Sequence, residues 1–124
     1  MINALFTIVM LAIQPSAATP YEMVAAQPVE WSRVELERLV VDTFPENPSL
    51  ALRVVDCESK FDPTAVSVTG DHGLWQINQI HMRPGGAAHG VGDRIYDPVV
   101  NSRIARVIYE EAGGFGPWTC ARKG

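Results

Sequence analysis

A nearly continuous apolar helical pattern that ends in a carboxylic acid constrains this chain more than any other feature. Asn47 and Pro48 are residues of the kinds that favour the N-cap and the first position of a helix, so a helix is expected to begin there. It is expected to end near Ser59, one residue after Glu58. The apolar residues within it are Leu50, Leu52, Val54 and Val55. Because they leave little polar surface, the pattern predicts a buried central helix with Glu58 at its end.

Two further helices are expected, one before and one after this central helix along the chain. Residues 31–44 show an uneven apolar face, with Trp31 expected in the core, and the following Pro-containing segment stops the helix. A last helix is expected to begin near Asp97 and to end at Gly113-Gly114. Its apolar stripe consists of Val100, Ile104, Val107 and Ile108. The chain therefore predicts a small, mainly helical, single domain without an internal repeat.

The segments between the helices are rich in turn-forming residues. Asp62-Pro63 and residues 69–73 are expected to be turns, and the glycine content of residues 83–92 favours a flexible loop. Little of this region alternates between apolar and polar residues, so the sequence by itself indicates no strand.

The length and the charge of the chain exclude some classes of protein. Its 124 residues suit one small domain. The formal net charge is −4, from 10 Lys and Arg against 14 Asp and Glu, and no basic stripe is present. This composition argues against a nucleic-acid-binding protein.

The N-terminal residues resemble an export signal. The apolar run of residues 4–13 is too short to span a bilayer comfortably, and small residues at 16–18 follow Pro15. We expect a signal peptide over 1–18, an extended linker over 19–29 and the domain over 30–124. No Lys or Arg precedes the apolar run, so an uncleaved membrane anchor or a misassigned start are the alternatives. With cleavage, the protein would be secreted or held in the cell envelope, without a stable membrane span.

The two cysteines fit an exported protein. Cys57 and Cys120 are the only ones, and an even number in a small exported domain indicates one disulfide. It would fix the end of the central helix that carries Glu58 and hold Trp118 near the cleft. The alternative is a pair of buried free thiols. No CxxC or His-x-x-x-His spacing is present, and His72, His81 and His89 have no partner spacing, so no metal site is expected.

Polar residues recur at fixed distances after Glu58. Glu58-Ser59 is followed by Pro63-Thr64-Ala65-Val66-Ser67 and then by Gly73-Leu74-Trp75-Gln76. This pattern resembles the soluble lytic transglycosylase type of the lysozyme-like superfamily, across residues 48–120 and most closely across 57–78. The resemblance implies an α+β lysozyme-like fold with a central catalytic helix and a short loop or β-hairpin lobe. It also implies cleavage of the β-1,4 bond between N-acetylmuramic acid and N-acetylglucosamine in peptidoglycan strands, with no cofactor.

The resemblance gives Glu58 the role of general acid and base. Such an acid must stay protonated near neutral pH, which an apolar neighbourhood favours; the alternative is a solvated glutamate at a helix end. Gln76 would hydrogen-bond to a sugar, and Ser67 would orient the acid or the substrate's N-acetyl group. Their alternatives are a buried structural amide and a turn hydroxyl. Ser59 is expected to be a structural hydroxyl.

Asp71 is open to two interpretations. Residues 71–78 are similar to the Asp-x-Gly-x-x-Gln-Ile-Asn segment of animal-type lysozymes, in which that Asp is the second carboxylate. If Asp71 faces Glu58, a retaining hydrolysis with two carboxylates is expected. If it is only a turn residue, Glu58 works alone, with help from the N-acetyl group, and the muramic 6-hydroxyl attacks to give a 1,6-anhydro product.

Four more residues are candidates for binding the glycan. They are Trp75, Asn78, Tyr109 and Trp118. Aromatic rings can stack on the flat faces of pyranose rings, although Trp75 could equally pack beneath the cleft. Tyr109 matches a tyrosine of the transglycosylases only loosely.

Three alternatives to a lytic transglycosylase remain open at this point. The first is a lysozyme that hydrolyses the same bond with water, and the second is a glycan-binding module without activity on the same fold. The third is a component of a secretion, conjugation or phage tail assembly that thins the wall locally.

Overall fold

The computed structural model describes residues 30–122, and its folded unit begins at Trp31. The expected signal peptide and linker, residues 1–18 and 19–29, lie outside the described residues. Among the described residues, no helix has the length and apolar character needed to cross a membrane.

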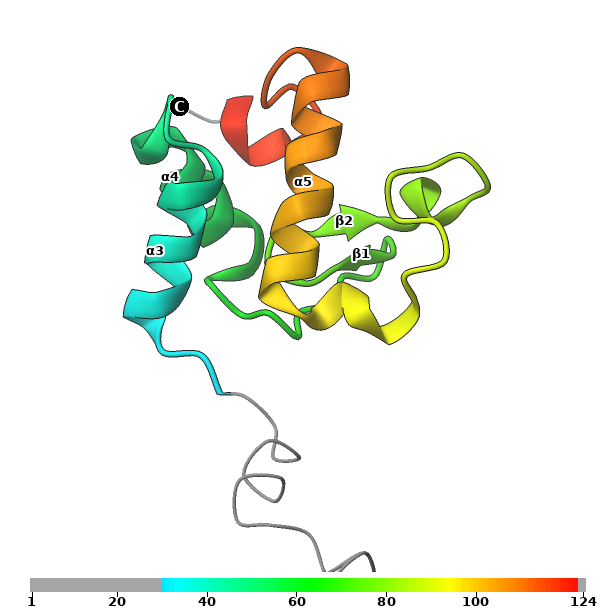
Figure 1. The fold of residues 1–124 in the computed structure, drawn as a ribbon, viewed down its shortest axis with the longest axis horizontal. Helices are drawn as coiled ribbons and strands as arrows, with labels where there is room; N and C mark the ends of the chain where they lie inside the picture. The colour runs from blue at the N-terminus through cyan, green and yellow to red at the C-terminus, as the bar shows by residue number, and fades with distance from the viewer. Residues whose placement is uncertain (1–29, 123–124) are drawn as a thin grey trace, which may run out of the picture. The chain divides into compact units, whose positions relative to one another are not determined.

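Three α-helices and one small sheet make up the domain (Figure 1). The helices are α3 (Arg33–Thr43), α4 (Pro48–Ser59) and α5 (Pro98–Ala112). The strands are β1 (Asp71–His72) and β2 (Ile77–Asn78), and three short 3-10 helices complete the fold: η1 (Gln79–Met82), η2 (Gly92–Tyr96) and η3 (Thr119–Arg122). The prediction of a small, mainly helical α+β domain is confirmed.

Helix α3 begins with a reciprocal cap that the sequence analysis did not identify. The Ser32 hydroxyl accepts from the amide of Glu35 at 3.1 Å, and the Glu35 carboxylate accepts from the amide of Ser32 at 3.3 Å. Each side chain satisfies an amide that a helix start leaves unpaired. Leu36 and Val40 face the core and pack this helix against α4.

Helix α4 occupies the bounds that the sequence predicted. It starts at Pro48 and ends at Ser59, with Ala51, Val54 and Val55 fully buried, although the Asn47 side chain makes no capping hydrogen bond. The chain then turns sharply through two successive left-handed residues, Lys60 (φ 53°) and Phe61 (φ 58°). This conformation is uncommon for residues other than glycine.

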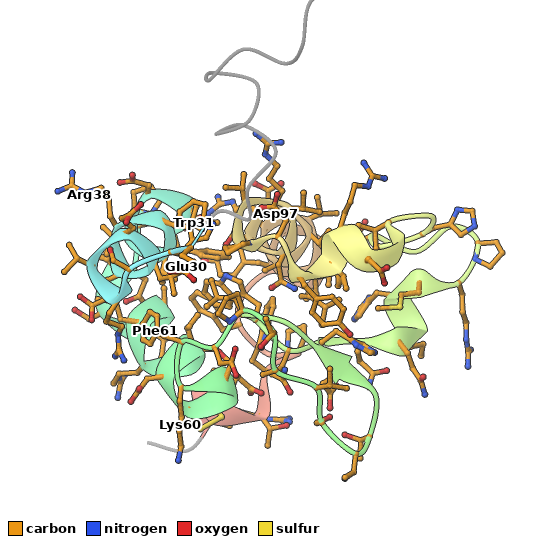
Figure 2. The ribbon with its side chains drawn as sticks, turned by 90° about the horizontal axis from the view of Figure 1, so that it is seen from below. Glu30, Trp31, Arg38, Lys60, Phe61 and Asp97 are labelled. Atoms are coloured by element: carbon orange, nitrogen blue, oxygen red, sulfur yellow. A yellow bond between two sulfur atoms is a disulfide. The ribbon has the colours of Figure 1, made fainter. Side chains whose placement is uncertain are left out.

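Burial of Phe61 stabilises this turn. The ring of Phe61 is 6% exposed and lies under the guanidinium of Arg33, whose Cζ is 3.8 Å from the ring centroid. Figure 2 shows the side chain of Lys60, by contrast, extending away from the domain. Packing and a cation–π contact therefore hold the chain in the conformation that ends α4 at Ser59, one residue after Glu58.

Helix α5 also matches its predicted start and end. The Asp97 carboxylate accepts from the amides of Val99 at 2.8 Å and Val100 at 3.4 Å, and Gly113 ends the helix with φ 77°. The predicted apolar stripe was wrong in one residue, because Val107 is 42% exposed. The buried face instead includes two polar residues, Asn101 and Ser102, which bind the loop beside it.

The two strands form a hairpin whose second strand packs beside α5 (Figure 1). Asp71 pairs with Asn78 and His72 with Ile77. Each strand has only two residues, so there is no alternation that the sequence could have displayed. The hairpin is the short lobe that the resemblance implied.

An aromatic cluster fills the space between the helices and the hairpin. Its members are Phe44, Trp75, Tyr109, Phe115 and Trp118. The Trp75 ring is fully buried, and its Nε1 donates to the Ser102 hydroxyl at 3.1 Å. The Trp118 indole donates in turn to the carbonyl oxygen of Trp75 at 2.8 Å. These bonds satisfy both indole N–H groups inside the core. Trp31 packs against the edge of this core and is only partly buried.

Candidate active site

One cavity of about 120 Å³ collects residues from five parts of the domain. Its polar lining consists of Glu58, Asp71, Gln76, Asn78, His81 and Thr119, and its apolar lining of Ile77, Ile108, Pro117 and Trp118. The end of α4, the hairpin, η1, α5 and the C-terminal segment 117–119 all contribute. The structure thus brings Glu58 and Asp71, the two carboxylic acids singled out in the sequence, to the same cavity.

Glu58 stands in the last turn of α4 and is held there from the C-terminal segment. Its Oε1 accepts from the backbone amide of Cys120 at 3.3 Å. Cys120 is itself bonded to Cys57 by a disulfide, with 5.9 Å between the Cα atoms, so the predicted pairing is confirmed. The residues on either side of the acid along the helix are therefore both fixed, Cys57 by this bond and Ser59 by the contacts described next.

Ser59 connects the end of α4 to the Gly-Leu-Trp-Gln segment. Its hydroxyl is buried and lies 2.7 Å from the carbonyl oxygen of Leu74 and 3.3 Å from that of Val55. The expectation that Ser59 is a structural hydroxyl agrees with these contacts. They set the position of the loop that carries Gln76 relative to the helix that carries Glu58.

Asp71 is surrounded by hydrogen-bond donors. Its Oδ2 accepts from the hydroxyls of Ser67 and Thr69, each at 2.6 Å, and its Oδ1 accepts from the Asn78 amide at 2.8 Å. Burial by itself would raise the pKa of Asp71, but these three hydrogen bonds, with a smaller effect of His72, outweigh it and lower the pKa below the ordinary value. Asp71 is therefore an ionised carboxylate at neutral pH.

Gln76 presents a fixed amide to the cavity. Its backbone is left-handed, with φ 51°, and its Nε2 donates to the carbonyl oxygens of Ala65 and Gly73, each at 3.1 Å. Since those two bonds use both N–H groups, Oε1 is the atom left to act on a substrate, as an acceptor. This geometry suits a hydrogen bond from a sugar hydroxyl or an acetamido N–H.

The side chains of Asn78 and Ser67 make hydrogen bonds to Asp71. The Asn78 amide donates to Asp71 and to the Thr69 carbonyl at 3.3 Å, while its Oδ1 accepts from the amide of Ile80 at 3.0 Å. Ser67 does not line the cavity, and its hydroxyl contacts the carboxylate and the amide of Asp71. The geometry favours both as supports of Asp71, whereas the sequence analysis expected Asn78 to bind the glycan and Ser67 to orient the acid or the N-acetyl group.

The sequence model of the transglycosylase SLT domain family matches residues 42–119, which is more than half of the chain. The chain belongs to this family. A search of curated proteins and a search of solved structures each gave no match. Membership assigns a function of the peptidoglycan lytic transglycosylase kind at the level of the family, with a substrate that lies outside the cytoplasm.

The three aromatic candidates have different places in this SLT domain. Trp75 has no exposed surface, so it packs beneath the cavity, which was the second of its two expected roles, and offers no face to a sugar. Trp118 lines the cavity, although only 4% of it is exposed. Tyr109 does not line it; its ring packs against Phe44 and Phe115, with centroids 4.9 and 4.7 Å away.

Sequence reasoning missed several residues that build the site of this SLT domain. His81, Ile108, Pro117 and Thr119 line the cavity, and Thr69 holds Asp71. Asn101 is fully buried: it accepts from the amide of Trp75 at 2.8 Å and donates to the carbonyls of His72 at 3.0 Å and Ile95 at 2.9 Å.

One signal for Asn101 was present in the sequence. Asp97 and Pro98 mark the start of α5, so the sequence places Asn101 in the first turn of this helix. The same contact explains Gly73, because a Cβ there would lie 2.4 Å from Nδ2 of Asn101. Helix α5 and the Gly-Leu-Trp-Gln loop are thus fitted to each other through one asparagine and one glycine.

In the part of the chain that the structure describes, no three His, Cys, Asp or Glu side chains lie close enough together to hold a metal ion.

Proposed function

We propose that this protein cleaves the β-1,4 bond between N-acetylmuramic acid and N-acetylglucosamine in peptidoglycan, with Glu58 as general acid. The observation that supports this most is the placement of Glu58, at the end of α4, in a cavity that also contains Asp71 and Gln76. Glycosidic cleavage requires a proton for the leaving oxygen and stabilisation of an oxocarbenium-like centre. A glutamic acid and an ionised carboxylate in one cavity are suited to these two tasks.

The first step is the same for every product. The Glu58 carboxyl gives its proton to the glycosidic oxygen, and the bond between that oxygen and the anomeric carbon breaks. Glu58 is then a carboxylate and accepts a proton from the nucleophile that attacks the anomeric carbon. In a lytic transglycosylase this nucleophile is the 6-hydroxyl of the same muramic acid, and the product is a 1,6-anhydro sugar.

A second candidate is hydrolysis, and the state of Asp71 favours it. Ser67, Thr69 and Asn78 keep this carboxylate ionised and in one orientation. A fixed anion beside the anomeric centre would stabilise positive charge there or form a covalent intermediate that water then resolves. Asp71 would in that case be a working carboxylate, and the products would carry reducing ends.

The type of product distinguishes the two candidates. The full chain is incubated with purified peptidoglycan, and the released muropeptides are identified by mass spectrometry. Products lighter by one water than hydrolysed ones would identify the transglycosylase, and Asp71→Asn should then keep substantial activity. Reducing products that are lost in Asp71→Asn would identify the hydrolase. Absence of any released muropeptide would contradict both and favour a glycan-binding module.

Export is part of this proposal. We infer that residues 1–18 direct the chain across the membrane and that 19–29 connect the signal to the domain. The disulfide between Cys57 and Cys120 supports an oxidising compartment. Detection of a mature N-terminus at Thr19 in the envelope or the medium would test this.

A further inference from the structure

A second cavity lies between η2 and α5 and differs in charge from the first. It is an open groove of about 290 Å³. Three basic side chains line it, His89, Arg94 and Arg103, and its apolar lining includes Val91, Val100 and Ile104. We call this site the basic groove. No acidic side chain of the described residues lines it.

The charges of the basic groove are not compensated within the described part of the protein. Arg33 and Arg106 each pair with carboxylates, whereas neither Arg94 nor Arg103 forms an ion pair with a described residue. Two acidic residues, Asp93 and Asp97, lie close to Arg94 in the sequence. Asp97 uses its carboxylate to cap α5, and Asp93 is exposed and does not line the groove. In a chain with a net charge of −4, two unpaired guanidinium groups above an apolar floor form a site for an anionic ligand with apolar parts.

The basic groove adjoins the active-site cavity through a single loop. His81 lines the active-site cavity, and its carbonyl oxygen accepts from the amide of Ala88 at 2.9 Å. His89, the next residue, lines the basic groove. The backbone of the loop at Gly86 lies close to that of His81, because a Cβ on Gly86 would be 2.1 Å from the carbonyl oxygen of His81. One backbone segment therefore separates the two sites.

We propose that the basic groove binds the carboxylates of the stem peptide that the muramic acid of the substrate carries. The proposal rests on the proposed function. A stem peptide leaves the glycan strand at a muramic acid, and four extended residues span roughly 13 Å. The contact between His81 and Ala88 leaves one backbone segment for such a peptide to cross. Guanidinium groups bind carboxylates in a planar, two-point geometry, and the apolar floor suits the alanine methyl groups of such a peptide.

The test compares two substrates that differ only in the peptide. Strands with stem peptides are compared with strands from which an amidase has removed them. We expect the wild type to show about ten-fold higher kcat/KM on the peptide-bearing strands, mainly through KM. The double variant Arg94→Gln/Arg103→Gln should lose this preference and keep its activity on peptide-free strands. Arg38→Gln is the control, because Arg38 is exposed on α3 and points away from the domain (Figure 2).

A binding measurement separates this proposal from the proposed function. The isolated stem peptide is titrated into the full chain and into the double variant. Binding that is lost in the double variant and kept in Arg38→Gln supports the basic groove even if no glycan is cleaved. Equal kcat/KM on both substrates, an undiminished preference in the double variant, or equally tight binding of an unrelated acidic peptide would overturn the proposal.

Discussion

The backbone amide of Cys120 donates a hydrogen bond to the carboxyl group of Glu58, at 3.3 Å and across 62 positions of the chain. The disulfide from Cys120 to Cys57 makes this contact part of a closed structure, since Cys57 immediately precedes the acid. The C-terminal segment therefore belongs to the candidate site: it contributes Pro117, Trp118 and Thr119 to the cavity wall and one donor to Glu58.

Removing the disulfide should weaken both the fold and the site. The bond closes a loop with a sequence separation of 63, and the chain-entropy model assigns roughly 4 kcal/mol to a loop of this length. We expect Cys57→Ala/Cys120→Ala to lower the free energy of unfolding by about 2–4 kcal/mol and to reduce glycan cleavage under conditions where the variant is still folded. Urea denaturation and muropeptide release measure the two effects. Full activity in the folded variant would show that the C-terminal segment keeps its place without the bond.

The stability of the protein should depend on Asp71 in a defined pH range. Its folded-state pKa is lower than the ordinary value of 3.8, so the ionised form stabilises the fold above that value. This contribution is lost as the pH falls through the folded-state pKa. The difference in unfolding free energy between the wild type and Asp71→Asn should therefore be constant near neutral pH and decrease below about pH 4. A difference that does not change with pH down to about pH 2 would contradict the lowered pKa.

Thr69 should set the pKa of Asp71, and through it the rate if Asp71 takes part in cleavage. Thr69→Val removes one of three donors, so the pKa of Asp71 should rise towards its ordinary value. If the ionised Asp71 takes part in cleavage, the acid limb of the kcat/KM profile should move to higher pH. Thr64→Val is the matched control, because the Thr64 hydroxyl binds a different carboxylate, that of Asp62, at 2.7 Å. If the acid limb of the kcat/KM profile does not move in Thr69→Val, the ionised Asp71 takes no part in the rate-determining step.

Asn101 should be among the most sensitive positions of α5. Asn101→Ala leaves one buried amide and two carbonyls without their partner, and each such loss costs about 1–3 kcal/mol. We expect a decrease of at least about 3 kcal/mol in the free energy of unfolding. Asn47→Ala should have little effect by comparison, because the Asn47 side chain makes no capping bond. Similar stabilities of the two variants would show that the contacts of Asn101 are not needed to join α5 to the hairpin.

The helices were predictable because their signals are local. Pro48 and Asp97 mark helix starts and Gly113 a helix end through backbone chemistry that acts within one turn. The hairpin was implied only by the resemblance, because two-residue strands contain no period that the sequence could show. The acid Glu58 could be selected from spacing and resemblance, but the contact that holds it comes from Cys120, near the other end of the chain.

The roles of the polar and aromatic candidates depended on tertiary contacts that no spacing reveals. Gly-Leu-Trp-Gln is compatible with a tryptophan that faces the cavity or the core, and only the packing of α5 and Ser102 decides for the core. Asn78 was expected to bind the glycan and Ser67 to orient the acid or the N-acetyl group, whereas the hydrogen bonds of both side chains go to Asp71. The basic groove joins Arg94 and Arg103 with His89, and no sequence motif linked these three residues.

The central claim is that Glu58 supplies the proton for glycosidic cleavage. The direct measurement is the rate of muropeptide release from purified peptidoglycan by Glu58→Gln, beside Glu111→Gln, which changes an exposed glutamate of α5 in the same way. We expect a loss of at least about 100-fold for Glu58→Gln with glycan binding kept, and an unchanged rate for Glu111→Gln. Equal rates for Glu58→Gln and the wild type would contradict it.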